Sequence, residues 1–495
     1  QGRPTGARRA HHTHPTFGEY RTMITPRSLP ISALFGALIA VPAFAQQSEP
    51  QQPLQVAVAE TARVEAPAPA DSTTKPAAPA AAMTPAIRVQ NVRPMDQRGI
   101  NTFEAPKDDA VPYEGFKLDW NAAFAQQFQT MGHENTAAPR MAKDAAGKEY
   151  NANQLMDIGW GFNLPTANLG LNAQLAPGIR VALETYLSSR HHQETWVKGG
   201  YLQIDQSPID HPVLHSIMDV VTIKAGMFPL NYGDAHFRRS DNGQVMHNPF
   251  VGNLILDAWT FEPGAEVYLR KSGFMAMGAV TSGSNKGDVT KPETRGPAFY
   301  GKLGVDRQLS DLLRVRLTGS YYRADKTPTL YFGDRAGSRY YMVLENTVAT
   351  TSAQFTSGLI NPAFSNHVRA IQVNPFVRFG ALELFGVIEK AEGRTAAETA
   401  HRTVNQYSGD VIYRLLNDRL YVGGRRNTVD GEIPISGKTF DVGIDRTALA
   451  AGWYVTPTIL LKGEYVRQQY NDFPSTDIRS GGKFDGFVIE GAVSF

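Results

Sequence analysis

The chain has 495 residues, of which 42% are hydrophobic and 19% are charged, and its sequence contains no cysteine. It is rich in glycine, tyrosine and phenylalanine, a composition that fits an all-β protein better than a helical one. The lack of cysteine excludes disulfides, thiolate metal sites and a cysteine nucleophile from this sequence. The formal net charge of +2 does not indicate a nucleic-acid-binding protein.

The first 45 residues predict export from the cytoplasm. Residues 31–45 read ISALFGALIAVPAFA, follow Arg27 and end in an A-x-A cleavage pattern. We therefore expect a secretory signal peptide over residues 23–45, which starts at Met23, and an upstream extension or misassigned start over residues 1–22. The alternative is a short buried helix. No later stretch approaches the roughly 18–20 apolar residues that a membrane-spanning helix needs.

Residues 46–112 predict an Ala/Pro-rich periplasmic linker. Residues 46–85 are rich in Ala, Pro, Gln and Thr and lack the apolar periodicity that a core requires, so we expect them to be disordered. This linker is either a solvated spacer or a tether that contacts the cell wall. Residues 86–112 can instead form a short segment in front of the next domain.

The remainder of the chain, residues 113–495, alternates between apolar and polar residues with a period of two. In the last candidate strand, Phe487, Ile489 and Val493 share one face, while Glu490 lies on the other. One apolar and one polar face fit either a soluble β-sandwich or a membrane β-barrel. Full charges in the middle of the polar rows favour the barrel, because a wet lumen accepts charges that a dry core excludes.

The candidate strands form an even-numbered set, which places both ends of the barrel domain on the same side of the membrane. Short turns and long loops alternate between them. We assign residues 338–346 to a long loop, because an additional strand would break the parity. The candidate strands lie near residues 116–128, 167–176, 179–188, 196–206, 220–228, 256–270, 274–282, 298–308, 313–324, 368–379, 381–391, 402–416, 419–429, 439–455, 459–470 and 484–495. The predicted fold class is all-β, a transmembrane antiparallel up-and-down β-barrel of about 16 strands.

Several stretches resemble a known family. GGYLQID at 199–205, VVTIKAGMFPLNYGD at 220–234 and ILLKGEYVRQQY at 459–470 resemble the phosphate-selective porin O and P family of Gram-negative outer-membrane porins. The ending DGFVIEGAVSF, with its terminal Phe495, resembles the signal that the barrel-assembly machinery reads. The resemblance covers about residues 113–495. It implies a barrel of about 16 strands, usually a homotrimer, in the outer membrane of a diderm bacterium.

The resemblance also implies that loop 229–255 folds into the barrel and narrows the pore. The side chains that would line this constriction are Asp234, His236, Arg238, Arg239 and Asp241. Arginine donors suit oxyanions because the guanidinium fork matches two oxygens, whereas acids opposite bases produce a transverse field for small polar solutes. The alternative is that these residues bind one another and only hold the loop in place.

Charged residues on the polar faces are candidates to line the lumen. They are Lys117, Arg180, Lys224, Arg314, Arg316, Arg378, Arg414, Lys462 and Glu464. Over all the polar faces the basic and acidic candidates balance, whereas a dedicated phosphate channel is expected to be basic along its path. Each assignment assumes that no bulge reverses the two faces of a strand.

Catalysis and metal binding have little support in the sequence. His191 and His192 fit an exposed loop better than a metal site, and His211 and His215 have no evident third ligand. No compact group of nucleophile, base and orienting residue is evident. We therefore expect no enzyme, no cofactor and no bound metal.

Two functions remain open. We expect a porin for passive diffusion of ions and small hydrophilic solutes, including anions such as phosphate. Its partners would be outer-membrane lipid, other copies of the chain and the barrel-assembly machinery. The alternative is a structural or adhesive outer-membrane barrel with a cell-wall tether and no open pore, which predicts an ordered segment within residues 86–112 or a sealed pore.

Overall fold

The computed structural model describes residues 89–107, 111–188, 196–285, 292–326, 328–331, 337–350 and 352–495. The expected upstream extension and signal peptide, residues 46–88 and 108–110 of the expected linker, and His191 and His192 lie outside the described residues. Within the described ranges, no helix is both long enough and apolar enough to cross a membrane.

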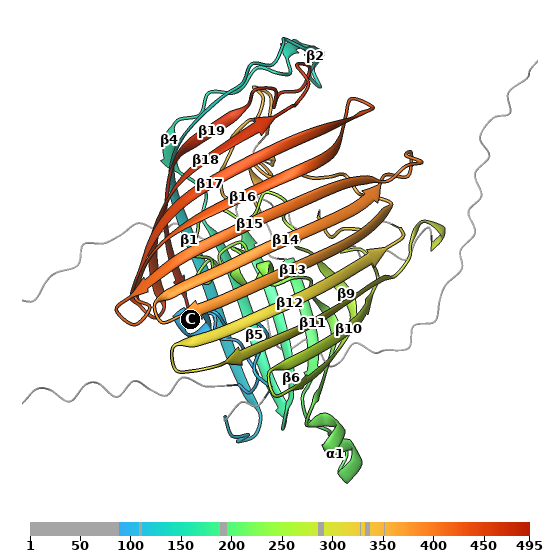
Figure 1. Ribbon diagram of the computed structural model, residues 1–495, viewed down its shortest axis with the longest axis vertical. Helices are drawn as coiled ribbons and strands as arrows, with labels where there is room; N and C mark the ends of the chain where they lie inside the picture. Colours follow the sequence, from blue (N-terminus) through green and yellow to red (C-terminus); the bar gives the residue numbers. More distant parts are fainter. Residues whose placement is uncertain are drawn as a thin grey trace, which may run out of the picture. The chain divides into compact units, whose positions relative to one another are not determined.

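Sixteen long strands form one closed antiparallel barrel in this part of the chain (Figure 1). They are β1 (Lys117–Glu134), β5 (Thr166–Ala176), β6 (Ile179–Ser188), β7 (Trp196–Ile204), β8 (Val221–Pro229), β9 (Phe261–Lys271), β10 (Phe274–Thr281), β11 (Ala298–Gln308), β12 (Leu313–Ala324), β13 (His367–Phe379), β14 (Leu382–Arg394), β15 (Arg402–Leu415), β16 (Leu420–Ile435), β17 (Lys438–Thr456), β18 (Ile459–Asn471) and β19 (Lys483–Ser494). Each strand pairs with its neighbours along the chain, and β1 closes the barrel against β19, with Ala123 opposite Ser494. The expected barrel fold is confirmed.

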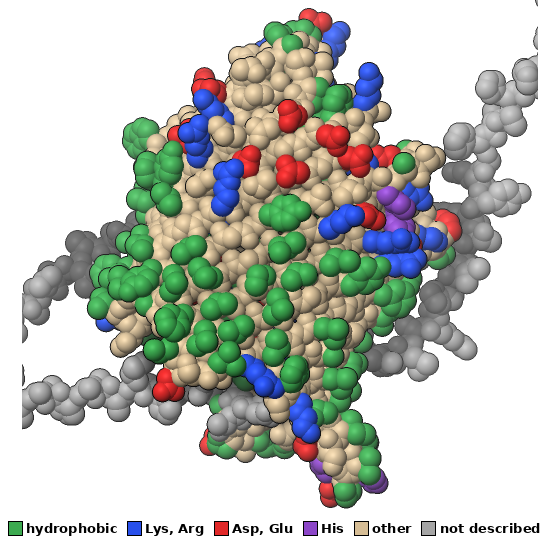
Figure 2. All heavy atoms as spheres, in the orientation of Figure 1, with side chains coloured by type: hydrophobic (Ala, Val, Ile, Leu, Met, Phe, Trp, Pro, Cys, Tyr) green, Lys and Arg blue, Asp and Glu red, His purple; other side chains and the backbone are tan. Residues whose placement is uncertain are grey.

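The apolar rows of the strands face outward. In β19, Phe487 and Ile489 are 57% and 52% exposed, whereas the adjacent Glu490 is completely buried. Figure 2 shows hydrophobic side chains gathered in a band over the strands, with charged side chains above it. We call these outward apolar side chains, such as Val411 and Leu449, the apolar belt. Because exposed apolar area is unfavourable in water at about 25 cal/mol per Å², the belt favours a lipid surround.

All the expected strands occur, and β11 and β12 have the expected bounds. β1 and β16 extend beyond the expected ends, to Glu134 and Ile435, because their backbone pairing with β19 and β17 continues past the apolar rows. Residues 338–346 contain no strand and lie in a loop, as expected. Three short strands lie near the long loops, and of these only β4 joins the barrel sheet. β4 (Trp160–Phe162) pairs with β1 above β5, and β2 (Met141–Lys143) forms a hairpin with β3 (Glu149–Asn151).

The connections alternate between short turns at one end of the barrel and long loops at the other. One connection at the short-turn end is longer and holds α1 (Pro212–Met218), which begins after His211. The His211 ring accepts a hydrogen bond from the Val213 N–H at 3.3 Å, and proline favours the first helical turn. In Figure 1, α1 and β2 lie beyond opposite ends of the barrel. The described 3-10 turns are η1 (Gln97–Gly99), η2 (Ala235–Arg238), η3 (Pro292–Thr294) and η4 (Ala353–Phe355).

Three parts of the chain enter the barrel. They are the inner segment (residues 89–107), the loop between β8 and β9 (residues 230–260) and the loop between β12 and β13 (residues 325–366, described in part). Apolar side chains from these parts pack against inward side chains of the wall; Phe103, for example, joins Phe376 in one buried cluster. Much of the inner wall therefore contacts protein rather than open water.

Candidate functional site: the filled lumen and its cavity

Asp234, at the start of loop 230–260, is completely buried and contacts two cations of the wall. Its carboxylate lies 2.6 Å from Nζ of Lys302 in β11 and 2.8 Å from Nε of Arg316 in β12. The Thr318 hydroxyl donates to it at 2.8 Å. Burial alone would raise the pKa of the Asp234 carboxyl, but Lys302 and Arg316 outweigh burial and lower the pKa. Asp234 is therefore an ionised anchor that holds the loop against the wall.

Arg238 is a second anchor of the same loop. Its Nη2 atom lies 2.6 Å from Oε1 of Glu383 in β14, and its Nη1 donates to Oδ1 of Asn101 at 2.7 Å. Glu383 also accepts a hydrogen bond from Nε of Arg414 at 2.8 Å. The Asn101 amide also donates to Glu383, so this carboxylate joins the loop, the wall and the inner segment.

Arg239 and Asp241 form a separate group. The Arg239 guanidinium binds both oxygens of Asp257 at 2.7–2.9 Å, and its Nη1 lies 3.6 Å from Asp241. Asp241 in turn forms an ion pair with Lys198 of β7 and accepts a hydrogen bond from the Tyr186 hydroxyl. This group holds the loop against the opposite side of the barrel from Arg238.

His236 lies among aromatic rings. Its ring stacks on Trp259 with centroids 5.8 Å apart and contacts Phe237 at 3.9 Å. Burial, assisted by the charge of Lys302, lowers the pKa of His236 well below its ordinary value. The ring is therefore neutral at pH 7, and its Nδ1 atom has no hydrogen-bond partner among the described residues.

The five side chains expected at a pore constriction thus lie in the inward loop, where four of them form buried ion pairs with the wall or with one another. These contacts match the alternative in which the residues hold the loop in place. The guanidinium groups of Arg238 and Arg239 already bind protein carboxylates, so neither offers an open fork to a passing anion.

The inner segment crosses the short-turn end of the lumen. The Gln97 N–H donates to the Pro457 carbonyl in the turn between β17 and β18 at 2.9 Å. The Gly178 N–H, in the turn between β5 and β6, donates to Oε1 of Gln90 at 3.1 Å. These two turns are close neighbours around the barrel, because only β19 and β1 lie between them, so both contacts hold the segment to one side of the opening.

The deepest contacts of the inner segment come from Phe103 and Glu104. The Phe103 ring meets Phe376 edge-on at 5.3 Å between centroids. The Glu104 carboxylate lies 2.9 Å from Nη1 of Arg316 and 3.2 Å from Nζ of Lys302. Asp234 and Glu104 therefore share the same two cations, and a buried cluster with two acids and two bases links loop, wall and segment.

The loop between β12 and β13 also enters the lumen, which the sequence analysis did not predict. Arg339 forms a buried ion pair with Glu490 of β19, and the Tyr340 hydroxyl donates to Oε1 of Glu464 at 2.5 Å. The Gln129 amide donates to the Tyr341 carbonyl at 2.9 Å. The stretch SRYYMVLEN, residues 338–346, shows only weak alternation between apolar and polar residues. Its two adjacent tyrosines were the one sequence signal that this loop is buried.

The expected lumen-lining residues differ in their partners. Seven basic members pair with a carboxylate: Lys117 with Glu114, Lys224 with Glu266, Arg314 with Asp306, Arg316 with Asp234, Arg378 with Asp418, Arg414 with Glu383 and Lys462 with Glu490. Glu464 accepts hydrogen bonds from the Val251 N–H and from Tyr340. Arg180 is the exception, because no described carboxylate lies within ion-pair distance of it.

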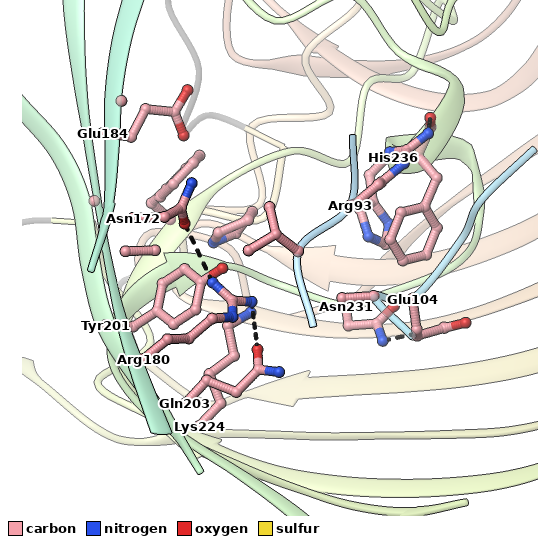
Figure 3. A pocket seen from close by; sticks show the side chains of 18 of the residues that line it. Arg93, Glu104, Asn172, Arg180, Glu184, Tyr201, Gln203, Lys224, Asn231 and His236 are labelled. Carbon is pink, nitrogen blue, oxygen red and sulfur yellow. Dashed lines mark hydrogen bonds between the residues drawn. The ribbon is translucent and has the colours of Figure 1, made fainter. Parts of the chain in front are cut away.

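A cavity of about 290 Å³ remains between the inner segment and the wall formed by β5 to β9 (Figure 3). Its polar lining comes from the wall, the inner segment and the loop, and Figure 3 shows these side chains around one space. The charged lining residues are Arg93, Glu104, Arg180, Glu184, Lys224 and Arg270. Basic groups thus outnumber acids among the lining residues. Partners outside this list neutralise some of both kinds: Glu104 binds Lys302 and Arg316, Lys224 pairs with Glu266, and Arg270 lies 3.8 Å from Asp205.

Solved outer-membrane proteins resemble this chain in fold at low sequence identity. The anion-selective porin from Comamonas acidovorans is 12% identical over 77% of this chain and 100% of that chain, with a TM-score of 0.46. The channel DcaP of Acinetobacter baumannii is 10% identical over 78% of this chain and 99% of that chain, with a TM-score of 0.45. OmpT of Vibrio cholerae is 10% identical over 77% and 100%, with a TM-score of 0.44.

No protein-family model matches the chain, and no curated protein matches it well enough to count as a relative. The scores of the solved structures are low, so the barrel and its lumen rest on the strand pairings and side-chain contacts described above.

Sequence reasoning missed several residues of this site, and all of them lie in segments without regular strands. Phe103 and Glu104 belong to the expected linker, and Arg339 and Tyr340 belong to an expected outer loop. A phenylalanine next to a glutamate within NTFEAP was the available signal, because such residues are unusual in an otherwise Ala/Pro-rich stretch.

Proposed function

We propose that the protein is an outer-membrane channel for passive diffusion of small hydrophilic solutes, including anions such as phosphate. The observation that carries this proposal is the closed barrel with an apolar belt outside, charged rows inside and a basic cavity within the lumen. A barrel that only anchored a tether would not need charged inward rows on most of its strands. The protein acts without covalent chemistry, as a non-enzymatic channel.

The orientation of the barrel follows from its two ends. We place the short turns and the inner segment at the periplasmic side and the long loops at the cell surface. Export by the signal peptide of residues 23–45 would deliver the chain, and the last strand with Phe495 would be read by the barrel-assembly machinery. The mature protein would then stand in outer-membrane lipid as a homotrimer.

The solute path would follow the cavity beside β5 to β9, which is the space left where loop 230–260 crosses the lumen between β14 and β7. Loop 230–260 would narrow this path through the backbone held in place by Asp234, Arg238 and Arg239. The buried anchors would fix the width of the path, and cavity-lining side chains would contact the solute.

A second candidate function is a structural barrel without an open pore. The specific observation in its favour is the inner segment, which is held across the lumen by Gln97, Phe103 and Glu104. In this second function, the linker of residues 46–112 would act as a tether, and the barrel would anchor it in the membrane.

Planar-bilayer conductance of the refolded mature chain distinguishes the two functions. The variant F103A/E104Q, which removes the deepest contacts of the inner segment, is measured beside the unmodified chain. Stepwise currents from the unmodified chain support the channel, and reversal potentials in a KCl gradient with added phosphate report its selectivity. Currents from the variant alone indicate a channel that the inner segment closes. Silence from both folded proteins contradicts the channel and favours the structural barrel.

A further inference from the structure

Arg180 of β6 and Arg446 of β17 are buried arginines of the described wall with no carboxylate within ion-pair distance, and of these two only Arg180 lines the cavity. Arg180 is 4% exposed, and its guanidinium donates to two neutral amide oxygens, Gln203 at 2.7 Å and Asn172 at 3.4 Å. The guanidinium carbon Cζ lies over the Tyr201 ring, 5.6 Å from its centroid. Its Nε atom has no partner among the described residues.

Neutral amides orient a guanidinium but do not compensate its charge. A buried cation without a counter-charge is costly, which is why the neighbouring wall residues Arg316 and Arg414 bind carboxylates. Arg180 instead faces the cavity of about 290 Å³ that separates it from the inner segment (Figure 3). An anion in this cavity would supply the missing counter-charge.

Other groups around the same cavity also have donors without partners. Nε of Arg270 and the indole Nε1 of Trp259 are buried and unbonded within the described chain, and both residues line the cavity. Unpaired buried donors cost about 1–3 kcal/mol each, so a group that accepts hydrogen bonds here would be favoured. Lys224 lies beside Arg180 and is neutralised by Glu266 at 3.2 Å.

The remaining lining limits the chemical class of the anion. The rings of Phe237, Trp259 and Phe261 line the cavity together with Leu183 and Met227. An inorganic oxyanion has no apolar surface to place against these side chains, whereas an organic carboxylate has both an anionic group and an apolar body. The volume lies near the lower end of the roughly 300–1,000 Å³ range of ligand pockets, so the ligand is small.

We propose that this cavity binds a small organic carboxylate, whose anionic group bonds Arg180 while its apolar body packs against Phe237, Trp259 and Phe261. The site rests on the proposed function in one respect, because the ligand would reach it along the solute path. The inner segment forms one side of the site through Arg93, so the site is complete only with this segment in place. A charge-assisted bond to the planar guanidinium favours a carboxylate over a neutral amide of the same shape.

The test uses benzoate as the probe and the full mature chain, refolded in detergent micelles. Binding is followed by titration calorimetry and by tryptophan fluorescence, to which Trp259 in the cavity contributes. We expect Arg180→Gln to raise the Kd for benzoate at least tenfold. We also expect the unmodified protein to bind benzamide, the neutral isostere, and inorganic phosphate at least tenfold more weakly than benzoate.

Arg446→Gln is the matched control. Arg446 is also a buried guanidinium without a described carboxylate partner, but it lies outside the cavity and bonds Gln468 and two backbone carbonyls. This variant should bind benzoate as the unmodified chain does, and the heat-dependent gel shift of the barrel confirms that each variant is folded.

Equal benzoate affinity of Arg180→Gln and the unmodified chain would overturn the proposal. Phosphate or benzamide binding as tight as benzoate would overturn it as well, and this comparison needs no variant. Because binding is measured without current, a silent barrel that binds benzoate would refute the channel and keep the site. A conducting barrel that does not bind benzoate would keep the channel and refute the site.

Discussion

Glu104 of the inner segment lies 2.9 Å from Arg316 of β12, and this buried ion pair joins two residues that are 212 positions apart in the sequence. Lys302 of the adjacent strand contacts the same carboxylate at 3.2 Å. Burial alone would raise the pKa of Glu104, but the charges of Lys302 and Arg316 outweigh it and hold the pKa well below its ordinary value. This ion pair thus holds the inner segment, which forms none of the barrel strands, inside the barrel.

The substitution Glu104→Gln should release the inner segment. Breaking a buried ion pair lowers the free energy of unfolding by about 3–5 kcal/mol. We expect a smaller loss of about 2 kcal/mol here, because Arg316 keeps its contact with Asp234. Trypsin should then cleave after Lys107, whose side chain is buried against β7 and β8 in the intact protein. The control is Glu114→Gln, which breaks an exposed pair with Lys117 and should leave cleavage unchanged. Equal cleavage of the two variants would show that Glu104 does not hold the segment.

The substitution Arg238→Ala should loosen loop 230–260, because it removes one of the two guanidinium partners of Glu383. We expect a loss of about 2–4 kcal/mol, seen as a lower midpoint of the heat-dependent gel shift. Adding Glu383→Gln should recover part of this loss, since the uncompensated carboxylate is then gone. Arg426→Ala, in an exposed pair with Asp445, should cost less than about 1 kcal/mol. A changed reversal potential with an unchanged midpoint would instead favour Arg238 as an anion filter.

Mild acid should destabilise the filled lumen through His236 and His247. Burial lowers the pKa of both rings well below the ordinary value of 6.5, and His247 contacts the Asp96 carbonyl of the inner segment at 3.1 Å. The open state therefore binds more protons below pH 6.5, and the packed state loses stability as the pH falls through that value. Glu104 acts in a lower pH range, because a depressed carboxyl pKa gives a contribution that is present above the ordinary value of 4.5 and is lost as the pH falls below that value.

The measurement is the midpoint of the heat-dependent gel shift at pH 7.5 and pH 5. The double variant H236Q/H247Q should show a smaller fall in midpoint than the unmodified chain. His211→Gln, at the exposed position just before helix α1, should show the full fall. An equal fall in all three proteins would assign the pH dependence to other groups.

Gly233→Ala should displace the start of loop 230–260. Gly233 has a φ of +67°, and a Cβ atom there would overlap the side chain of Gln372 in β13. Gly437 has a φ of +80° with open space around it, so Gly437→Ala carries only the left-handed strain of about 1 kcal/mol. A larger fall in the gel-shift midpoint for Gly233→Ala than for Gly437→Ala is the expected result. Equal falls would mean that the loop adapts to the added methyl group.

Much of the barrel could be predicted from the sequence, because a strand repeats every two residues and each face reports its own surroundings. Phe487 and Ile489 had to share a face, and Glu490 had to lie on the other, whatever the rest of the chain does. The positions of β11 and β12 followed in the same way. The long-loop end was less predictable, since β1 and β16 continue pairing where apolar alternation no longer marks the strand.

The sequence by itself determined the strands, their faces and the identity of the charged rows, since these depend on neighbours along the chain and on a local period. Only the tertiary structure decided which of these charged side chains lack an opposite charge from the protein and can therefore bind a solute. Arg238 and Arg180 are both arginines of the polar rows or the inward loop, yet Arg238 meets Glu383, whereas Arg180 meets two amides, the Tyr201 ring and a cavity. The physical reason is that charge compensation depends on distance in space, and Glu104, Arg316 and Asp234 come together only when strands, loop and segment close around one lumen.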